Sequence, residues 1–202
     1  LGDLALDSAV ARFPLRLIDA THVECDGRVY IQFSSNDYLG LSHHQSVCGA
    51  IADAAANAAG SGGSALSSGF TTLHQQCEAR IAEWKGVESA ILLPSGYQAN
   101  LAAVQLLTNL NGKTRFLLDK LVHASLIDAV RASDLPFRIF PHNDMQKLRR
   151  LLERAAPDEL QVVVTESIFS MDGDAADLHA LRQLKEEFNF VLLLDEAHAS
   201  GI

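Results

Sequence analysis

The sequence predicts an α/β fold with a mostly parallel sheet. Short apolar runs alternate with amphipathic segments along the chain, and the last run, residues 190–194, is apolar without interruption. Such a continuous apolar pattern is typical of strands covered on both faces, as the strands of parallel sheets are. Alternating strands and helices are the pattern of βαβ units, which build a parallel sheet.

The elements are expected in a regular order after an irregular start. Residues 1–44 lack a clear period and predict an arm outside the sheet, with a hairpin at Asp26-Gly27. Residues 45–202 carry the alternating pattern and form the predicted sheet domain. Helix starts are favoured by Ser95-Gly96 and by Asn143-Asp144. We expect strands at 90–93, 115–118, 137–140, 161–165 and 190–194, and helices at 45–59, 73–85, 97–109, 123–132, 144–155 and 177–188.

Composition excludes several classes of protein. Of the 202 residues, 48% are hydrophobic, which suffices for a core, and the net charge of -9 disfavours a nucleic-acid surface. No apolar stretch approaches the length of a membrane span, and the N-terminus lacks the pattern of a signal peptide. Three widely spaced cysteines without a CxxC motif indicate reduced thiols rather than a metal site. These features predict a soluble cytoplasmic enzyme.

Polar residues follow four of the expected strands. Ligands bind at the carboxyl ends of strands in open α/β sheets, so these positions are candidates for one site. A glycine after a strand and before a helix, as at Gly96, also suits phosphate binding at a helix N-terminus. The four strand ends carry Ser95-Gly96, Asp119 with His123, Glu166 with Ser170, and Asp195 with His198.

The acid at the end of the last strand is compatible with two chemistries, of which one fails. Asp195-Glu196-Ala197-His198 resembles the strand that holds Mg²⁺ in nucleotide hydrolases, and Gly112-Lys113-Thr114 resembles the end of a P-loop. A P-loop requires a glycine at the position of Leu107. It also leaves a strand and opens a helix, whereas this triplet leaves a predicted helix and enters a strand. The remaining possibility is an acid that holds the ring nitrogen of a cofactor.

Jointly, the motifs of the chain resemble the α-oxoamine synthases, pyridoxal-phosphate (PLP) enzymes of the fold-type-I aminotransferase class. The resemblance extends over nearly the whole chain. It implies that residues 45–202 are part of a three-layer PLP-binding large domain, truncated before its last strands and before the C-terminal small domain. The motifs that carry it are 33–41, 60–64, Ser68-Gly69 with His74, 95–100, 123–125, 142–144, 169–174 and 195–198.

The resemblance assigns roles around the cofactor ring. Asp195 pairs with the protonated pyridine nitrogen, and a cationic ring is the better electron sink. His123 stacks on one face of the ring and Ala197 packs on the other. His198 and Ser170 are implied to hydrogen-bond the phenolic oxygen. His123, Asp195 and His198 are therefore the expected catalytic residues.

Further roles concern the phosphate and the substrate. The resemblance implies that the amides of Gly96 and Tyr97 hold the cofactor phosphate. Asn36 and Glu166 match positions that line the active site. Arg12 stands in a stretch that is richer in arginine in the family, and it is a candidate for a substrate carboxylate. No metal is expected.

The implied reaction is a decarboxylative condensation of an amino acid with an acyl-CoA or acyl-carrier-protein thioester. The motifs favour L-alanine and a pimeloyl thioester, giving 8-amino-7-oxononanoate in biotin biosynthesis, in a cytoplasmic homodimer. Relatives that make 2-amino-3-ketobutyrate, 5-aminolevulinate or the sphingoid-base precursor share most of these residues and remain open. A non-catalytic truncated partner subunit is the alternative of a different class.

The resemblance also implies a Schiff-base lysine in the family, at a position downstream of Ile202. None of the five lysines of the chain stands in a matching sequence context, and residues 1–202 alone are therefore expected to be inactive. These lysines are Lys85, Lys113, Lys120, Lys147 and Lys185.

Overall fold

The computed structural model describes residues 13–110 and 113–202, and the chain divides into two compact units, 1–72 and 73–202. This boundary lies downstream of residue 45, where the sequence places the start of the sheet domain; the functional division into an arm and a PLP-binding domain stays a prediction. Arg12 and Gly112 lie outside the described residues. Within the described ranges, no helix combines the length and the apolar character needed to cross a bilayer.

The first unit contains a small antiparallel sheet, with the strands β1 (Arg16–Leu17), β2 (His22–Cys25) and β3 (Arg28–Ile31) in the order β1-β2-β3. Asp26 and Gly27 connect β2 to β3, and both have positive φ angles, of 49° and 74°. Two such residues form the turn whose twist matches a two-residue hairpin. The hairpin predicted at Asp26-Gly27 is confirmed.

The rest of the first unit consists of the 3-10 helix η1 (Leu41–His43), the helix α1 (Gln45–Asn57) and a glycine-rich loop. In that loop the carbonyl oxygen of Gly63 would lie 1.9 Å from a Cβ atom added to Gly69. Only glycine permits this approach, because any side chain at residue 69 would collide with backbone. The sequence motif at 60–69 therefore encodes a tightly closed loop.

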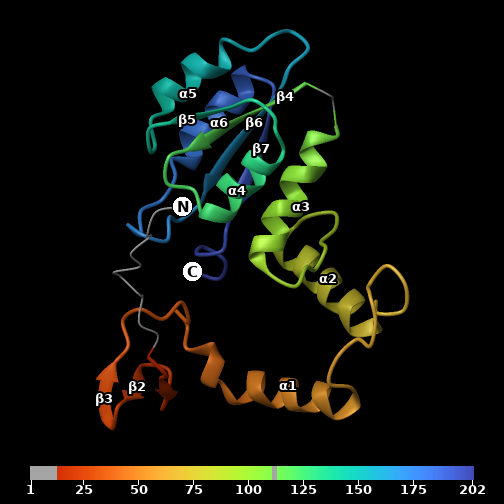
Figure 1. Ribbon diagram of the computed structural model, residues 1–202, viewed down its shortest axis with the longest axis vertical. Coiled ribbons are helices and arrows are strands. Elements are labelled where there is room, and N and C mark those ends of the chain that lie inside the picture. The colour runs from red at the N-terminus through yellow and green to blue at the C-terminus, as the bar shows by residue number, and fades with distance from the viewer. Residues whose placement is uncertain (1–12, 111–112) are drawn as a thin grey trace, which may run out of the picture. The chain divides into compact units, whose positions relative to one another are not determined.

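The second unit is built on four parallel strands in the order β5-β4-β6-β7 (Figure 1). The strands are β4 (Thr114–Asp119), β5 (Phe137–Phe140), β6 (Leu160–Glu166) and β7 (Phe190–Asp195). The strand bounds predicted from the sequence agree with the observed bounds of each strand to within one residue. The pairing of Glu166 with Asp195 sets the carboxyl ends of β6 and β7 side by side.

Helices cover both faces of this sheet. Side chains alternate between the faces along a strand, so Phe116 and Leu118 pack with α3 (Gly96–Thr108) and α4 (Ala124–Ala132). Leu117 and Val163 pack on the other face, with α5 (Met145–Leu152) and α6 (Leu178–Glu187). The result is a three-layer α/β/α arrangement (Figure 1). The expected α/β fold class is confirmed.

The segment 90–93 is not a strand, contrary to the prediction. It follows α2 (Thr72–Lys85) and is extended, but the described residues provide no strand beside it. The amide of Leu92 instead donates to Oε1 of Glu78, at 2.9 Å. An apolar run becomes a strand only where a neighbour supplies a hydrogen-bonding edge, and Ile91 remains 79% exposed.

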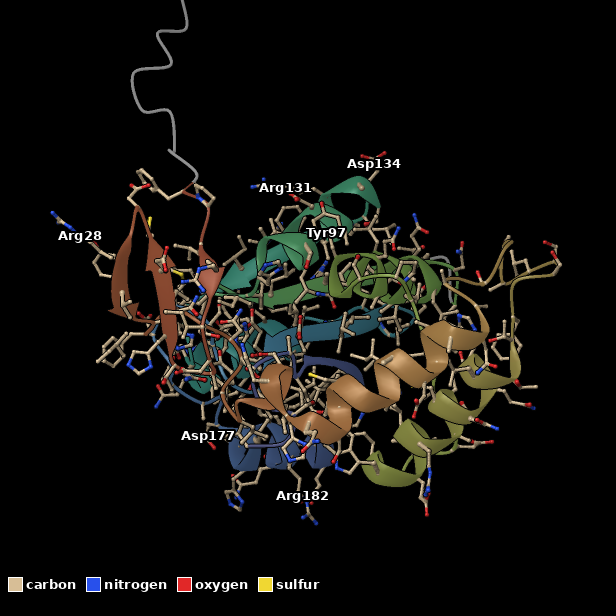
Figure 2. All side chains as sticks on the ribbon, turned by 90° about the horizontal axis from the view of Figure 1, so that it is seen from below. Arg28, Tyr97, Arg131, Asp134, Asp177 and Arg182 are labelled. Atoms are coloured by element: carbon tan, nitrogen blue, oxygen red, sulfur yellow. The ribbon has the colours of Figure 1, made fainter. Side chains whose placement is uncertain are left out.

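Polar side chains begin the helices of this unit. Ser95 Oγ accepts from the amide of Gln98, as expected from Ser95-Gly96. Asp144 accepts from Lys147 at 2.8 Å, and Asp177 accepts from Ala180 at 2.9 Å. Asp177 lies at the surface where α6 begins (Figure 2). These caps satisfy amides that the first turn of a helix leaves unpaired, and they fix where α3, α5 and α6 start.

Candidate active site

A pocket of about 330 Å³ lies at the carboxyl ends of the strands in the second unit. It receives residues from α3, from the loop between β4 and α4, and from the ends of β6 and β7. The size is within the range of small-molecule sites. The lining residues are Gly96, Tyr97, Ala99, Asn100, His123, Ser125, Glu166, Asp195, Ala197 and His198.

Three residues proposed from the sequence are not among those that line this pocket. Ser170 is exposed in the loop after β6. Asn36 belongs to the first unit and is exposed there. Arg12 lies outside the described residues, so the roles of all three stay predictions.

Three residues of the pocket, Ala99, Asn100 and Ser125, have no role predicted from the sequence, although the motifs contain all three. The spacing offered a signal for Asn100, because it stands four residues after Gly96 and therefore on the same face of α3. Ser125 follows His123 by two residues at the start of α4. Polar residues at these positions contact the predicted site residues.

The carboxylate of Asp195 is fixed by two hydrogen-bond donors. Nδ2 of Asn100 donates to Oδ2 at 2.9 Å, and the amide of Ala197 donates to Oδ1 at 2.9 Å. Hydrogen bonds to a charged acceptor are stronger than neutral ones. The two oxygens therefore keep a defined orientation at the wall of the pocket.

Glu166 lies beside Asp195 and is more deeply buried, with 3% of its surface exposed. Burial raises the pKa of Glu166, the hydrogen bond from the amide of His123 opposes this, and the charge of Asp195 raises it further. Two adjacent carboxyl groups disfavour double ionisation. This side of the pocket therefore suits a ligand that carries a cationic or hydrogen-bond-donating group.

The first turn of α3 forms another side of the pocket. Amides in the first turn of a helix lack intrahelical acceptors, and here Ser95 Oγ takes the amide of Gln98 while the amides of Gly96 and Tyr97 are left for another acceptor. The partial positive charge of a helix N-terminus adds to this preference for anions. The hydroxyl of Tyr97 donates to Asp128 on α4, at 2.9 Å, and this bond raises the pKa of Tyr97.

His123 is held by the residue two positions after it. Nδ1 of His123 accepts from the amide of Ser125 at 3.2 Å and lies 2.8 Å from Ser125 Oγ. Asn100 Nδ2 donates to the same Oγ at 2.9 Å. The orientation of the imidazole ring is therefore linked, through Ser125 and Asn100, to that of Asp195.

A second histidine bridges two carboxylates outside the lining of the pocket. Nδ1 of His142 lies 2.9 Å from Oδ1 of Asp119, and Nε2 lies 2.6 Å from Oδ2 of Asp174. Burial alone would lower the pKa of His142, but the hydrogen bonds to Asp174 and Asp119 outweigh burial and raise it. The imidazole ring therefore joins the end of β4 to the loop that precedes α6.

We expect this bridge to make stability depend on pH. The pKa of His142 is raised above 6.5 in the folded state, so its stabilisation is complete below that pH and is lost as pH rises through the folded pKa. Urea unfolding of the full-length protein is measured at about pH 6 and about pH 9. The free energy of unfolding should fall less between these two pH values for His142→Gln than for wild type. The exposed His179→Gln is the control; equal losses in all three proteins would contradict the bridge.

Comparison with known proteins places the chain in a family. The family model for aminotransferase class I and II matches residues 28–202. Similar solved structures include serine palmitoyltransferase from Sphingomonas wittichii, with 30% identity and a TM-score of 0.84 over 90% of this chain and 45% of that one. A serine palmitoyltransferase from S. paucimobilis, solved with bound PLP and myriocin, has 27% identity and a TM-score of 0.84 over 90% of this chain and 45% of that one.

An 8-amino-7-oxononanoate synthase from Francisella tularensis is also similar, with 27% identity and a TM-score of 0.66 over 81% of this chain and 44% of that one. The chain thus spans less than half the length of these proteins. The family model, by contrast, matches most of the chain, from β3 through β7. The chain therefore belongs to the aminotransferase class I and II family.

Proposed function

We propose that the pocket binds pyridoxal phosphate and that the full-length protein is an α-oxoamine synthase. The observation that carries the proposal is a pocket with a fixed carboxylate, Asp195, and the amide-rich first turn of α3 among its walls. PLP has a protonatable ring nitrogen and a phosphate, so the acceptor at Asp195 fits one end of the cofactor and the amide donors fit the other. The PLP-bound structure of the serine palmitoyltransferase from S. paucimobilis adds support.

In this proposal each end of the cofactor has its own partner. The amides of Gly96 and Tyr97 hold the phosphate, as helix N-termini do in other proteins. The carboxylate of Asp195 accepts a hydrogen bond from the protonated ring nitrogen and keeps that nitrogen cationic. The two donors already bound to Asp195 leave its orientation unchanged when the cofactor enters.

The remaining pocket residues are proposed to contact the ring and the reacting amino acid. His123 lies against one ring face, Ala197 against the other, and His198 hydrogen-bonds the phenolic oxygen together with Ser170. Glu166 stays near the reacting atoms, where burial raises the pKa of its carboxyl group. Asn36 lines the site, and Arg12 receives a substrate carboxylate.

The proposed reaction joins an amino acid to an acyl thioester. PLP, when bound, supplies an electron sink for the pair left on the amino acid's α-carbon. The α-carbon first loses its proton, and the electron pair left there forms a bond to the acyl carbonyl carbon while the bond from that carbon to the thiol sulfur breaks, releasing thiol. The bond to the carboxylate then breaks, releasing CO₂, and a proton takes its place on the α-carbon. Following the sequence motifs, we propose L-alanine and pimeloyl-CoA, or pimeloyl-carrier protein, as substrates and 8-amino-7-oxononanoate as product.

A second substrate pair is favoured by the structural comparison. The serine palmitoyltransferase from Sphingomonas wittichii superimposes with a TM-score of 0.84, against 0.66 for the 8-amino-7-oxononanoate synthase. Serine with palmitoyl-CoA is therefore the second candidate. In either case we propose a cytoplasmic homodimer, with residues 1–44 as an arm and 45–202 as part of the PLP-binding domain.

The test is thiol release by the full-length protein with PLP. Alanine, serine and glycine are each paired with pimeloyl-, palmitoyl-, acetyl- and succinyl-CoA, and free thiol and CO₂ are measured together. Release with alanine and pimeloyl-CoA alone supports the first pair, and release with serine and palmitoyl-CoA alone supports the second. PLP binding without release from any pair would instead indicate a non-catalytic partner subunit.

A further inference from the structure

We infer that Asn100 is a positioning residue that holds Asp195 and His123 in one fixed arrangement. The inference rests on the proposed function, because it concerns the same pocket. Asn100 lies on α3, whereas Asp195 ends β7 and His123 precedes α4, so a single amide connects three elements of the second unit. Each connection is a hydrogen bond whose direction the chemistry fixes.

The amide nitrogen of Asn100 sets the direction of the whole chain of bonds. Its two hydrogens are donated to Asp195 Oδ2 and to Ser125 Oγ, both at 2.9 Å. An amide NH₂ can only donate. Ser125 Oγ is therefore an acceptor toward Asn100, and its own hydrogen is free to point toward Nδ1 of His123, at 2.8 Å.

This direction selects one tautomer of His123. Nδ1 accepts from the backbone amide of Ser125, which cannot act as an acceptor, and from the Ser125 hydroxyl. The neutral imidazole then carries its proton on Nε2. Asn100 thereby orients the carboxylate of Asp195 and fixes His123 as the Nε2–H tautomer. These are two of the groups that the proposed function places against the cofactor ring.

Burial makes these hydrogen bonds costly to lose. Ser125 is fully buried, and Asn100 is partly buried. A buried polar group that loses its partner carries the full cost of desolvation. Removing the Asn100 amide would leave Ser125 Oγ and Asp195 Oδ2 each short of one donor, so both would be released to other arrangements.

The first experiment measures PLP binding to the full-length protein by equilibrium dialysis. Asn100→Ala should raise the Kd for PLP by about 10- to 100-fold, the usual effect of losing a hydrogen bond to a charged group. The matched control is Gln105→Ala, which removes an exposed amide from the same helix. Equal Kd values for Asn100→Ala and Gln105→Ala would overturn the inference.

A second variant reverses the hydrogen bonds without changing the shape of the side chain. Asn100→Asp places a carboxylate against Asp195, and two such groups ionise together only at a cost. PLP binding should then weaken progressively as pH rises through the acid range, relative to wild type. Gln105→Glu adds the same charge to α3 without touching Asp195. If Asn100→Asp shows no more pH dependence than this control, the positioning role is wrong.

The tautomer of His123 is measured by NMR in the PLP-free protein, with Asn100 unchanged. In PLP-free protein labelled with nitrogen-15 in histidine, the His123 signals, assigned with His123→Gln, should show a protonated Nε2 and an unprotonated Nδ1. The opposite tautomer would overturn the inference. Failure of wild type to bind PLP would overturn the proposed function instead, and would leave the tautomer result standing.

Discussion

Replacing Asp195 by Asn is expected to lower kcat of the full-length enzyme by about 10²- to 10³-fold, the range for losing one electrostatic partner of the transition state. The side chain keeps its size, but Asn100 and Ala197 donate to different oxygens of Asp195. The single oxygen of an Asn can keep one of these hydrogen bonds, and the other donor faces an NH₂ group. The negative charge that we propose keeps the ring nitrogen protonated is lost, and with it the preference for the cationic ring. Steady-state thiol release measures the change.

The control for Asp195→Asn is Asp177→Asn. Asp177 also carries a carboxylate, but it begins α6 at the surface and caps that helix. Its replacement should leave kcat within about twofold, because an Asn caps a helix nearly as well as an Asp. Unchanged turnover in Asp195→Asn would show that the charge of Asp195 has no role in the reaction.

Truncation of Phe116 to Ala is expected to lower the free energy of unfolding by about 3–5 kcal/mol. Phe116 has no exposed surface and lies on β4, where it packs against the layer formed by α3 and α4. A cavity at this position would loosen the helices that carry Gly96 and His123, so PLP affinity should fall along with stability. Urea unfolding of the PLP-free protein gives the first quantity, and dialysis gives the second.

Ile139→Ala is the comparison for the core substitution. Ile139 lies on β5, one of the two edge strands of the sheet in the described residues, and 48% of its surface is exposed. Its truncation should cost less than about 1 kcal/mol, as surface changes usually do. A cost for Phe116→Ala as small as that for Ile139→Ala would contradict the position of the core between the sheet and α3.

The parts of the fold predicted correctly from the sequence are those with a strong local signal. The continuous apolar runs at 161–165 and 190–194 predicted β6 and β7, because both faces of these strands are covered and no polar residue interrupts them. The serine before Gly96 predicted the start of α3, since its side chain caps the helix. Asp26-Gly27 predicted a hairpin, because both residues tolerate the positive φ angles that the turn requires.

The parts that were missed depend on contacts between distant segments. Residues 90–93 carry the same apolar pattern as a strand, but hydrogen-bond pairing decides a strand and the sequence does not contain that information. Asn100 and Ser125 were missed because a neutral polar residue in a helix has no fixed partner until α3, α4 and β7 come together. The strand ends, by contrast, were found because parallel strands deliver their carboxyl ends to one edge.

A crystal structure of the full-length protein with PLP would show directly whether this pocket holds the cofactor. We expect the cofactor in the pocket, with its phosphate on the amides of Gly96 and Tyr97, its ring nitrogen within hydrogen-bonding distance of Asp195, and its ring between His123 and Ala197. A structure with PLP bound elsewhere, or with its ring nitrogen facing a group other than Asp195, would contradict this expectation.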